Sequence, residues 1–159
     1  MCIRDRAPTD AHPDPTHDDA SARGAVEDLL AHYCMSVDDG RFSDFEDLWA
    51  PDAAMHVMGD THRGPAAVRA FMEAAQPEAA RGRHSIAAKL LRLDARAGTG
   101  AGWVDYVFFD ATGAATNIGR YHDRYLRGED GRWRFELREI VFRGSSPDVT
   151  DDWPSPAGP

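Results

Sequence analysis

The stretch ATNIGRYHDRYLRGEDGRWRFELREIVF, residues 115–142, decides the fold of this chain. Two segments rich in Ile, Val, Tyr, Phe and Trp, 115–127 and 132–142, lie on either side of Gly128-Glu-Asp-Gly131. Runs of β-branched and aromatic residues separated by Gly and Asp are typical of antiparallel strands joined by a turn. We therefore predict two paired strands, in which successive side chains point to opposite faces of the sheet.

Two similar segments precede this pair. Residues 83–93 and 102–110 are rich in Ile, Leu, Val, Tyr and Phe, and short links containing Gly, Ala, Thr and Arg connect them to each other and to the next strand. Four consecutive strands joined by short turns predict an antiparallel meander.

The first half of the chain predicts helices instead. Apolar residues recur at helical spacing over residues 25–37, and Asp38-Asp39-Gly40 ends this helix. Ser43 and Glu46 fit a capping box, which opens a second helix that continues through Trp49.

A third helix is predicted from Gly64-Pro65 to residue 76, because Pro is favoured in the first turn of a helix. Residues 53–58 predict a short strand. The fold class is therefore α+β, with three N-terminal helices packed on one face of a curved antiparallel sheet. Such an arrangement encloses a cone-shaped cavity, a common site for small ligands.

The length of 159 residues and a composition of 42% hydrophobic and 28% charged residues predict one globular domain. The formal net charge is −9, and residues 1–19 and 144–159 together carry eight Asp and two Arg, so about two thirds of this charge lies at the ends. Both ends are rich in Pro, Ser, Thr and Ala without periodicity, a composition typical of disorder. We expect disordered tails at 1–20 and 144–159 and a domain at 21–143, and we exclude 1–6, which resembles translated sequencing-adapter sequence.

The sequence lacks the motifs that are typical of several classes of function. No apolar run is long enough for a transmembrane helix, and basic residues are interspersed with acidic ones, so we expect neither membrane insertion nor nucleic-acid binding. No phosphate-binding GxxxxGK[ST] loop and no GxSxG nucleophile motif occur. Cys34 falls inside a helical pattern, and with Cys2 as the other thiol we expect no disulfide framework and a reduced, cytoplasmic protein.

Five motifs follow one another along the predicted domain: Tyr33-x4-Asp38-x-Gly-Arg-Phe42, Leu48-Trp-Ala-Pro-Asp52, Gly64-Pro-Ala-Ala-Val-Arg69, Arg83-His84, and Gly119 to Arg127 followed by Asp130 to Phe135. In this order and spacing they resemble the NTF2-like superfamily, specifically its SnoaL-like and scytalone-dehydratase-like branch. The resemblance covers residues 25–143 and implies a cone-shaped fold with a ligand pocket.

The resemblance also implies site residues. Scytalone-dehydratase-like members carry an Asp after the first helix and a His at the start of the first long strand, and these positions match Asp38 and His84. A second His of that dehydratase site falls here on Phe109 or Asp110, which is a departure from the pattern. A polar pocket position on the following strand matches His122.

On this resemblance we expect Asp38 and His84 to form a carboxylate–imidazole pair suited to acid–base chemistry. The carboxylate orients one ring nitrogen and leaves the other to remove a proton next to a carbonyl, with elimination, isomerisation or ring closure to follow. We predict a cofactor-independent lyase, isomerase or cyclase that acts on an oxygenated, aromatic or polyketide-like small molecule. Asp38, His84 and His122 are its predicted catalytic residues.

Other side chains are expected to contact the substrate. The predicted substrate-binding residues are Tyr33, Trp49, His56, Phe71, Tyr106, Phe108, Phe109 and Arg124. Arg124 and Arg138 could bind a carboxylate or an enolate, or instead pair at half-exposed positions with Asp123 or Glu136. We predict no metal or cofactor, although Asp38, His84 and His122 together would match the two-His, one-carboxylate set of non-haem iron sites.

Two alternatives remain open. The same fold serves non-catalytic ligand-binding modules, and it serves subunits that act through dimerisation. The resemblance implies a homodimer formed through the sheet. A close approach of Asp38 and His84 inside a cavity would favour the enzyme.

Overall fold

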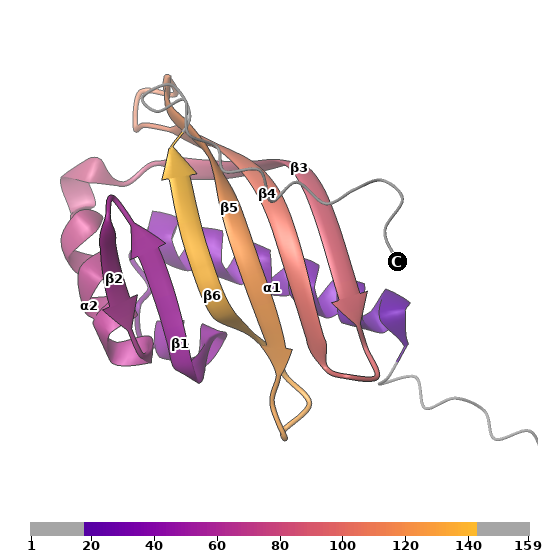
Figure 1. Cartoon of the computed structure of the whole chain (residues 1–159). Coiled ribbons are helices and arrows are strands. Elements are labelled where there is room, and N and C mark those ends of the chain that lie inside the picture. The colour runs from indigo at the N-terminus through magenta and orange to yellow at the C-terminus, as the bar shows by residue number, and fades with distance from the viewer. Residues whose placement is uncertain (1–17, 143–159) are drawn as a thin grey trace, which may run out of the picture.

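The computed structural model describes residues 18–142 (Figure 1). They form two α-helices and two 3₁₀ helices, in chain order α1 (Asp19–Asp39), Phe45–Leu48, α2 (Pro65–Ala75) and Glu78–Ala80. The strands are β1 (Trp49–Val57), β2 (Asp60–Arg63), β3 (Arg83–Asp94), β4 (Thr99–Phe109), β5 (Ala115–Arg127) and β6 (Trp133–Phe142). The predicted tails at 1–20 and 144–159 lie outside the described part except for residues 18–20, and there the prediction of disorder is wrong, because α1 begins at Asp19.

The strands form one sheet in the order β2-β1-β6-β5-β4-β3. The predicted meander of four strands is confirmed, because β3, β4, β5 and β6 pair antiparallel with their neighbours. The prediction of a wholly antiparallel sheet is wrong: β1 pairs parallel with β6, and Trp49 lies opposite Phe135. A local turn cannot produce this pairing, since the two strands are far apart in the sequence.

The prediction of three helices is also wrong. α1 begins at Asp19, six residues before the predicted start, and it ends as predicted at Gly40, which takes a left-handed conformation. The expected second helix is only the 3₁₀ turn Phe45–Leu48, which has no side-chain cap, and the Glu46 carboxylate lies 3.4 Å from Arg69 instead. The third predicted helix corresponds to α2.

The predicted strand at 53–58 is the second half of the longer β1. Met58 and Gly59 both have positive φ, at 52° and 83°, and join β1 to the short strand β2. Positive φ at both central residues is the geometry of a tight hairpin turn. A methionine at the first position gives no turn signal, so neither this hairpin nor β2 was predicted.

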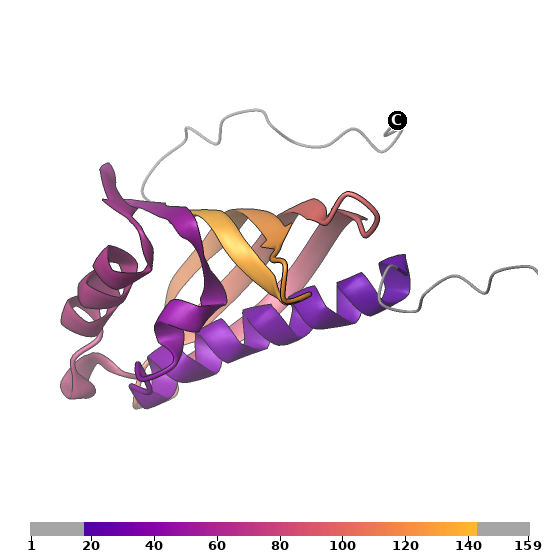
Figure 2. The ribbon, with the colours of Figure 1, turned by 90° about the horizontal axis from the view of Figure 1, so that it is seen from below.

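The helices lie on one side of the sheet, where α1 crosses the strands (Figure 2). The core between them contains many aromatic side chains, and the ring centroid of Tyr33 on α1 lies about 6 Å from those of four others: Phe45, Trp49, Tyr121 and Phe135. No described helix covers the opposite face, which we call the outer face. Between residues 18 and 142 no helix combines the length and apolar character needed to cross a membrane.

Candidate active site

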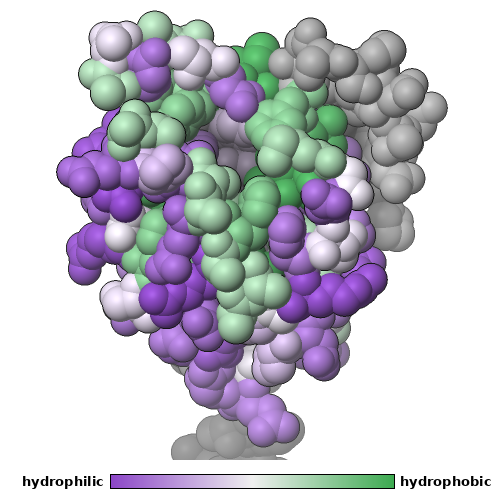
Figure 3. Space-filling view, turned by 90° about the vertical axis from the view of Figure 1, so that its left-hand side faces the viewer, coloured by the Kyte–Doolittle hydropathy of each residue, from purple (hydrophilic) through white to green (hydrophobic). Residues whose placement is uncertain are grey.

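A cavity of about 370 Å³ opens at the end of the sheet where β1 and β6 finish and β3 and β5 begin. Figure 3 views the molecule from the side of α2 and β2 and shows a hollow near the top, bordered by apolar surface. This volume lies within the usual range for small-molecule sites. Six aromatic side chains contribute to its lining: Tyr33, Phe71, Tyr106, Phe108, Tyr121 and Phe142.

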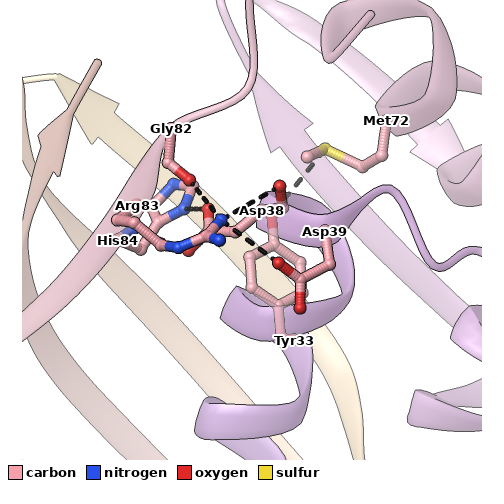
Figure 4. A network of polar contacts seen from close by, with 7 residues as sticks. All are labelled: Tyr33, Asp38, Asp39, Met72, Gly82, Arg83 and His84. Atoms are coloured by element: carbon pink, nitrogen blue, oxygen red, sulfur yellow. Dashed lines mark hydrogen bonds and ion pairs between the residues drawn. The ribbon is translucent and has the colours of Figure 1, made fainter. Parts of the chain in front are cut away.

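Asp38 and His84 meet at this cavity, although they are 46 positions apart in the chain (Figure 4). His84 Nδ1 lies 2.6 Å from Asp38 Oδ1, and the backbone N–H of His84 donates to Asp38 Oδ2 at 2.7 Å. The carboxylate therefore holds the same histidine by its ring and by its backbone. His84 lines the cavity and Asp38 does not, so Nε2 is the ring nitrogen left for a ligand.

The chain around this pair is held by Arg83, which precedes His84 at the start of β3 (Figure 4). Its Nη1 donates to the backbone oxygens of Asp38 at 3.3 Å and Gly82 at 2.9 Å, and it lies 3.1 Å from the Asp39 carboxylate. A cation at the C-terminus of a helix is electrostatically favourable. Arg83 thus ties the end of α1 to β3 where the catalytic candidates meet.

Three buried tyrosines form the floor of the cavity. The rings of Tyr106 and Tyr121 stack with centroids 4.5 Å apart, and the Tyr33 hydroxyl donates to the Met72 sulfur at 3.7 Å. Gly119 makes this stacking possible, because a Cβ at that position would lie 2.6 Å from the Tyr106 hydroxyl. Burial raises the pKa of Tyr33 to about 12, and it raises the pKa of Tyr106 and Tyr121 as well.

A buried ion pair lies directly behind this floor. Arg138 of β6 donates to both carboxylate oxygens of Asp123 on β5, at 2.8 and 2.7 Å, and both side chains are fully buried. The guanidinium carbon is 4.1 Å from the ring centroid of Tyr33 and 3.9 Å from that of Tyr121, so it contacts two floor residues through their faces. Arg138 Nη1 has no hydrogen-bond partner among the described residues.

Residues 18–139 match the family model of the SnoaL-like domain. The chain belongs to the SnoaL-like family. At the level of the fold this SnoaL-like protein is similar to an NTF2-like protein with a cystatin-like fold from Novosphingobium aromaticivorans, with 21% identity, a TM-score of 0.70, and coverage of 80% of this chain and 86% of that one. The resemblance to the SnoaL-like branch is thereby confirmed, and the fold agrees with the NTF2-like fold that the resemblance implied.

Two further solved structures resemble the SnoaL-like chain. One is a variant of the Mycobacterium tuberculosis protein Rv3472, described as a protein of unknown function, with 24% identity, a TM-score of 0.72, and coverage of 83% of this chain and 84% of that one. The other is a candidate scytalone dehydratase from Novosphingobium aromaticivorans, with 16% identity, a TM-score of 0.64, and coverage of 78% and 85%. At these identities the likeness shows the fold alone. A comparison with curated proteins found no match.

The SnoaL-like pocket brings together five of the residues singled out from the sequence. These are His84, Tyr33, Phe71, Tyr106 and Phe108, which all line the cavity. Trp49 does not line it and lies in the core, 2% exposed, against Tyr33 and Phe135. Phe109 follows the inward-facing Phe108 and therefore points to the outer face, because side chains alternate along β4.

Three other residues that were predicted to belong to the site lie on the outer face. Buried Tyr121, Asp123 and Tyr125 face the helices, so His122 and Arg124 point the other way. His122 Nδ1 lies 3.5 Å from Glu139, and Arg124 lies 3.4 Å from Glu136. His56 also alternates away from the buried Met55 and Val57.

Placing His122, His56 and Arg124 in the pocket was therefore wrong, because the face of each strand was assigned without the long-range register. Asp110, the alternative position for the second histidine of the family, lies in the β4–β5 turn and accepts hydrogen bonds from Thr112. The alternative metal site is likewise not assembled, since the sheet separates His122 from His84 and Asp38.

Sequence reasoning missed other features of this region. Gln76 was considered only as the end of a helix, but it lies one turn after Met72 and shares with it the cavity-facing side of α2. The expectation that Arg138 pairs with Asp123 is met, but at a buried rather than half-exposed position. Cys34 is buried as expected of a small apolar residue, and burial raises the pKa of its thiol to about 12.

Proposed function

We propose that this SnoaL-like protein is a cofactor-independent acid–base enzyme, a lyase, isomerase or cyclase that acts on an oxygenated, aromatic or polyketide-like small molecule. The observation that carries the proposal is the contact of 2.6 Å between His84 Nδ1 and Asp38 Oδ1 beside an aromatic cavity. A carboxylate on one ring nitrogen fixes the orientation of the imidazole and stabilises its protonated form.

The proposed step begins with His84 Nε2, which removes a proton from a carbon next to a substrate carbonyl. The electrons of the broken C–H bond form an enolate, and Asp38 stabilises the imidazolium. In a dehydration, the enolate expels a β-hydroxyl group, which takes the proton from His84 and leaves as water. In an isomerisation, His84 returns the proton to another carbon; in a cyclisation, the enolate carbon attacks a second carbonyl, whose oxygen takes the proton.

The test uses 2-tetralone, a neutral bicyclic ketone with acidic α-hydrogens. We expect the protein to accelerate exchange of these hydrogens in D₂O, followed by NMR, and His84→Gln to lower the acceleration by about 10²–10⁴-fold, the usual contribution of a general base. Asp38→Asn should lower it as well. His32→Gln is the matched control, because His32 is an exposed histidine on α1.

Two results of the exchange experiment would contradict the proposed catalysis. If 2-tetralone binds, as read from chemical-shift changes, and its exchange is no faster than in buffer, the protein is a binding module of the same fold. Exchange that is equally fast in wild type and His84→Gln would remove His84 as the base.

We further propose a homodimer formed through the outer face of the sheet. Val107 of β4 and Ile118 of β5 lie opposite each other there, and Ile118 is 49% exposed. Exposed apolar side chains on an uncovered sheet face favour association. Light scattering at micromolar concentration should give twice the monomer mass, and Ile118→Arg should give the monomer. A monomeric wild type at these concentrations would contradict the proposal.

A further inference from the structure

The turn between β1 and β2 places a residue that is unusual for a hairpin beside the cavity. Among the described residues, Met58 is the one non-glycine residue with a positive φ, at 52°. This conformation favours Gly, Asn and Asp, because a larger side chain crowds its own backbone there. Met58 is also 69% exposed, so a large apolar side chain lies in water. Both features cost free energy, and neither helps to form the hairpin.

Met58 lies at the mouth of the cavity. It lines the cavity together with its neighbour Val57, and Val57 is buried whereas Met58 is exposed. The hairpin is attached to the cavity wall, since the ring of His62 on β2 stacks on that of Phe71 on α2 with centroids 4.1 Å apart. The turn is therefore fixed at the rim, and its first residue carries the methionine side chain to the opening.

The rest of the exposed rim is mainly apolar as well. Besides Met58, the exposed residues that line the cavity within the described part are Ala75, Ala80 and Thr116. Ala75 ends α2 and Ala80 ends the 3₁₀ turn that follows it. The hollow in Figure 3 is accordingly bordered by apolar surface. A ligand group that leaves the cavity here meets methyl and thioether groups.

The exposure of Met58 gains a purpose when a ligand covers it. A thioether side chain is flexible and polarisable, so it adapts to apolar groups of different shape. Contact with a ligand removes its apolar surface from water, which favours binding in proportion to the area covered. Because aromatic rings form the floor and aliphatic side chains form the mouth, a ligand with an aromatic head and an apolar arm fits both parts.

We propose that Met58 is a specificity-determining residue that covers the apolar arm of a ligand whose oxygenated aromatic head occupies the cavity. The inference rests on the proposed function, because it concerns the same pocket. It adds that the ligand is longer than the cavity and carries an apolar extension that leaves through the mouth. It concerns binding and is tested without turnover.

The experiment compares two aryl ketones, acetophenone and hexanophenone, which differ by four methylene groups in the arm. Dissociation constants are measured by ligand-observed NMR titration. We expect wild type to bind hexanophenone about 10–50-fold more tightly than acetophenone, as partial burial of the added methylene groups allows. Met58→Asn should reduce this preference about 5-fold and leave the dissociation constant of acetophenone unchanged.

Asparagine is chosen because it tolerates a positive φ and forms a favoured hairpin turn with Gly59. Met58→Asn should therefore raise the melting temperature by about 2–4 °C while it weakens hexanophenone binding, a combination that a purely structural methionine would not give. Met58→Leu keeps an apolar side chain and should keep most of the preference. Met35→Asn is the matched control, because Met35 is 65% exposed on α1 and does not line the cavity.

The contact itself is read from NMR spectra of protein with ¹³C-labelled methionine methyl groups. Hexanophenone should shift the Met58 signal, which is identified by its absence from Met58→Leu, and acetophenone should not. The Met35 signal should stay in place with both ketones.

The inference is overturned if neither ketone binds up to its solubility limit, if hexanophenone binds no better than acetophenone, or if the Met58 signal does not shift. It is overturned equally if Met58→Asn keeps the full preference, because the arm then lies inside the cavity. A change of oligomeric mass in Met58→Asn with the preference intact would overturn it too, and would assign Met58 to a contact between subunits.

The outcome for Met58 is separate from the outcome for catalysis. Binding of hexanophenone that depends on Met58, without exchange of 2-tetralone, would contradict only the proposed catalysis. Exchange that depends on His84, with no effect of Met58→Asn on ketone preference, would contradict only the role of Met58.

Discussion

Asp123→Leu is expected to lower the free energy of unfolding by about 3–5 kcal/mol, the usual cost of leaving one member of a buried ion pair without its partner. Arg138 is fully buried, and the Asp123 carboxylate accepts two of its N–H groups. Burial alone lowers the pKa of Arg138, but the attraction and hydrogen bonds of Asp123 outweigh it and hold the pKa above its usual value. Arg138 thus stays charged in the core, and removing Asp123 leaves this buried positive charge without its carboxylate.

The change should be measured by urea denaturation beside two other variants. Asp123→Leu combined with Arg138→Met removes both charges and should recover most of the lost stability, since apolar replacement of a whole buried pair is often neutral. Glu136→Leu breaks the ion pair with Arg124 on the outer face of the same two strands, where both side chains are largely exposed. Its effect should stay within about 1 kcal/mol.

A loss in Asp123→Leu as small as that in Glu136→Leu would contradict the importance of the buried pair. The pair also matters for the site, because the Arg138 guanidinium contacts the rings of Tyr33 and Tyr121 at the cavity floor. Methionine does not reproduce the contact of a guanidinium with these rings, so binding of 2-tetralone should weaken in the double variant.

Alkaline pH is expected to unfold the protein in one step between about pH 11 and 12. All four tyrosines of the chain are buried, and burial is the main cause that raises the pKa of each, to about 12 for Tyr33. The unfolded chain releases phenol protons near pH 10, whereas the folded chain retains them. Above pH 10 the folded state binds more protons than the unfolded state, so the free energy of unfolding falls as pH rises.

The size of this effect follows from the number of tyrosines. Each contributes about 1.4 kcal/mol per pH unit between its unfolded and folded pKa, so the four tyrosines together contribute about 5.5 kcal/mol per unit. Over two pH units the loss in the free energy of unfolding equals the total stability of a typical domain. Tyrosinate absorbance at 295 nm should therefore rise together with the loss of far-ultraviolet circular dichroism.

Tyr106→Phe should make the dependence of stability on pH about one quarter less steep. Gradual tyrosinate absorbance near pH 10, with the circular dichroism unchanged, would show that the phenols are accessible and would contradict the buried floor.

The ends of helices and strands were predicted well from the sequence where single residues mark them. Glycine, proline and acidic residues marked the ends of α1, α2 and the strands of the meander, because each limits the backbone at its own position. The short 3₁₀ turn at Phe45–Leu48 was mistaken for a helix, since a capping pattern adds too little free energy to form one without a helix-long apolar face. The site was predicted in part, and its Asp38–His84 contact came from family resemblance.

By itself, the sequence determined that an α+β fold with a four-stranded meander would form, and that Asp38 would follow the first helix and His84 would begin a long strand. Only the tertiary structure decided that β1 joins β6, that His122 faces outward, and that Asp123 and Arg138 meet in the core. The physical reason is that the spacing of apolar residues and the residues that form turns are local features, which depend on neighbours in the chain. The face of a strand and the partner of a buried charge depend on register between distant segments, where a shift of one residue reverses every side chain.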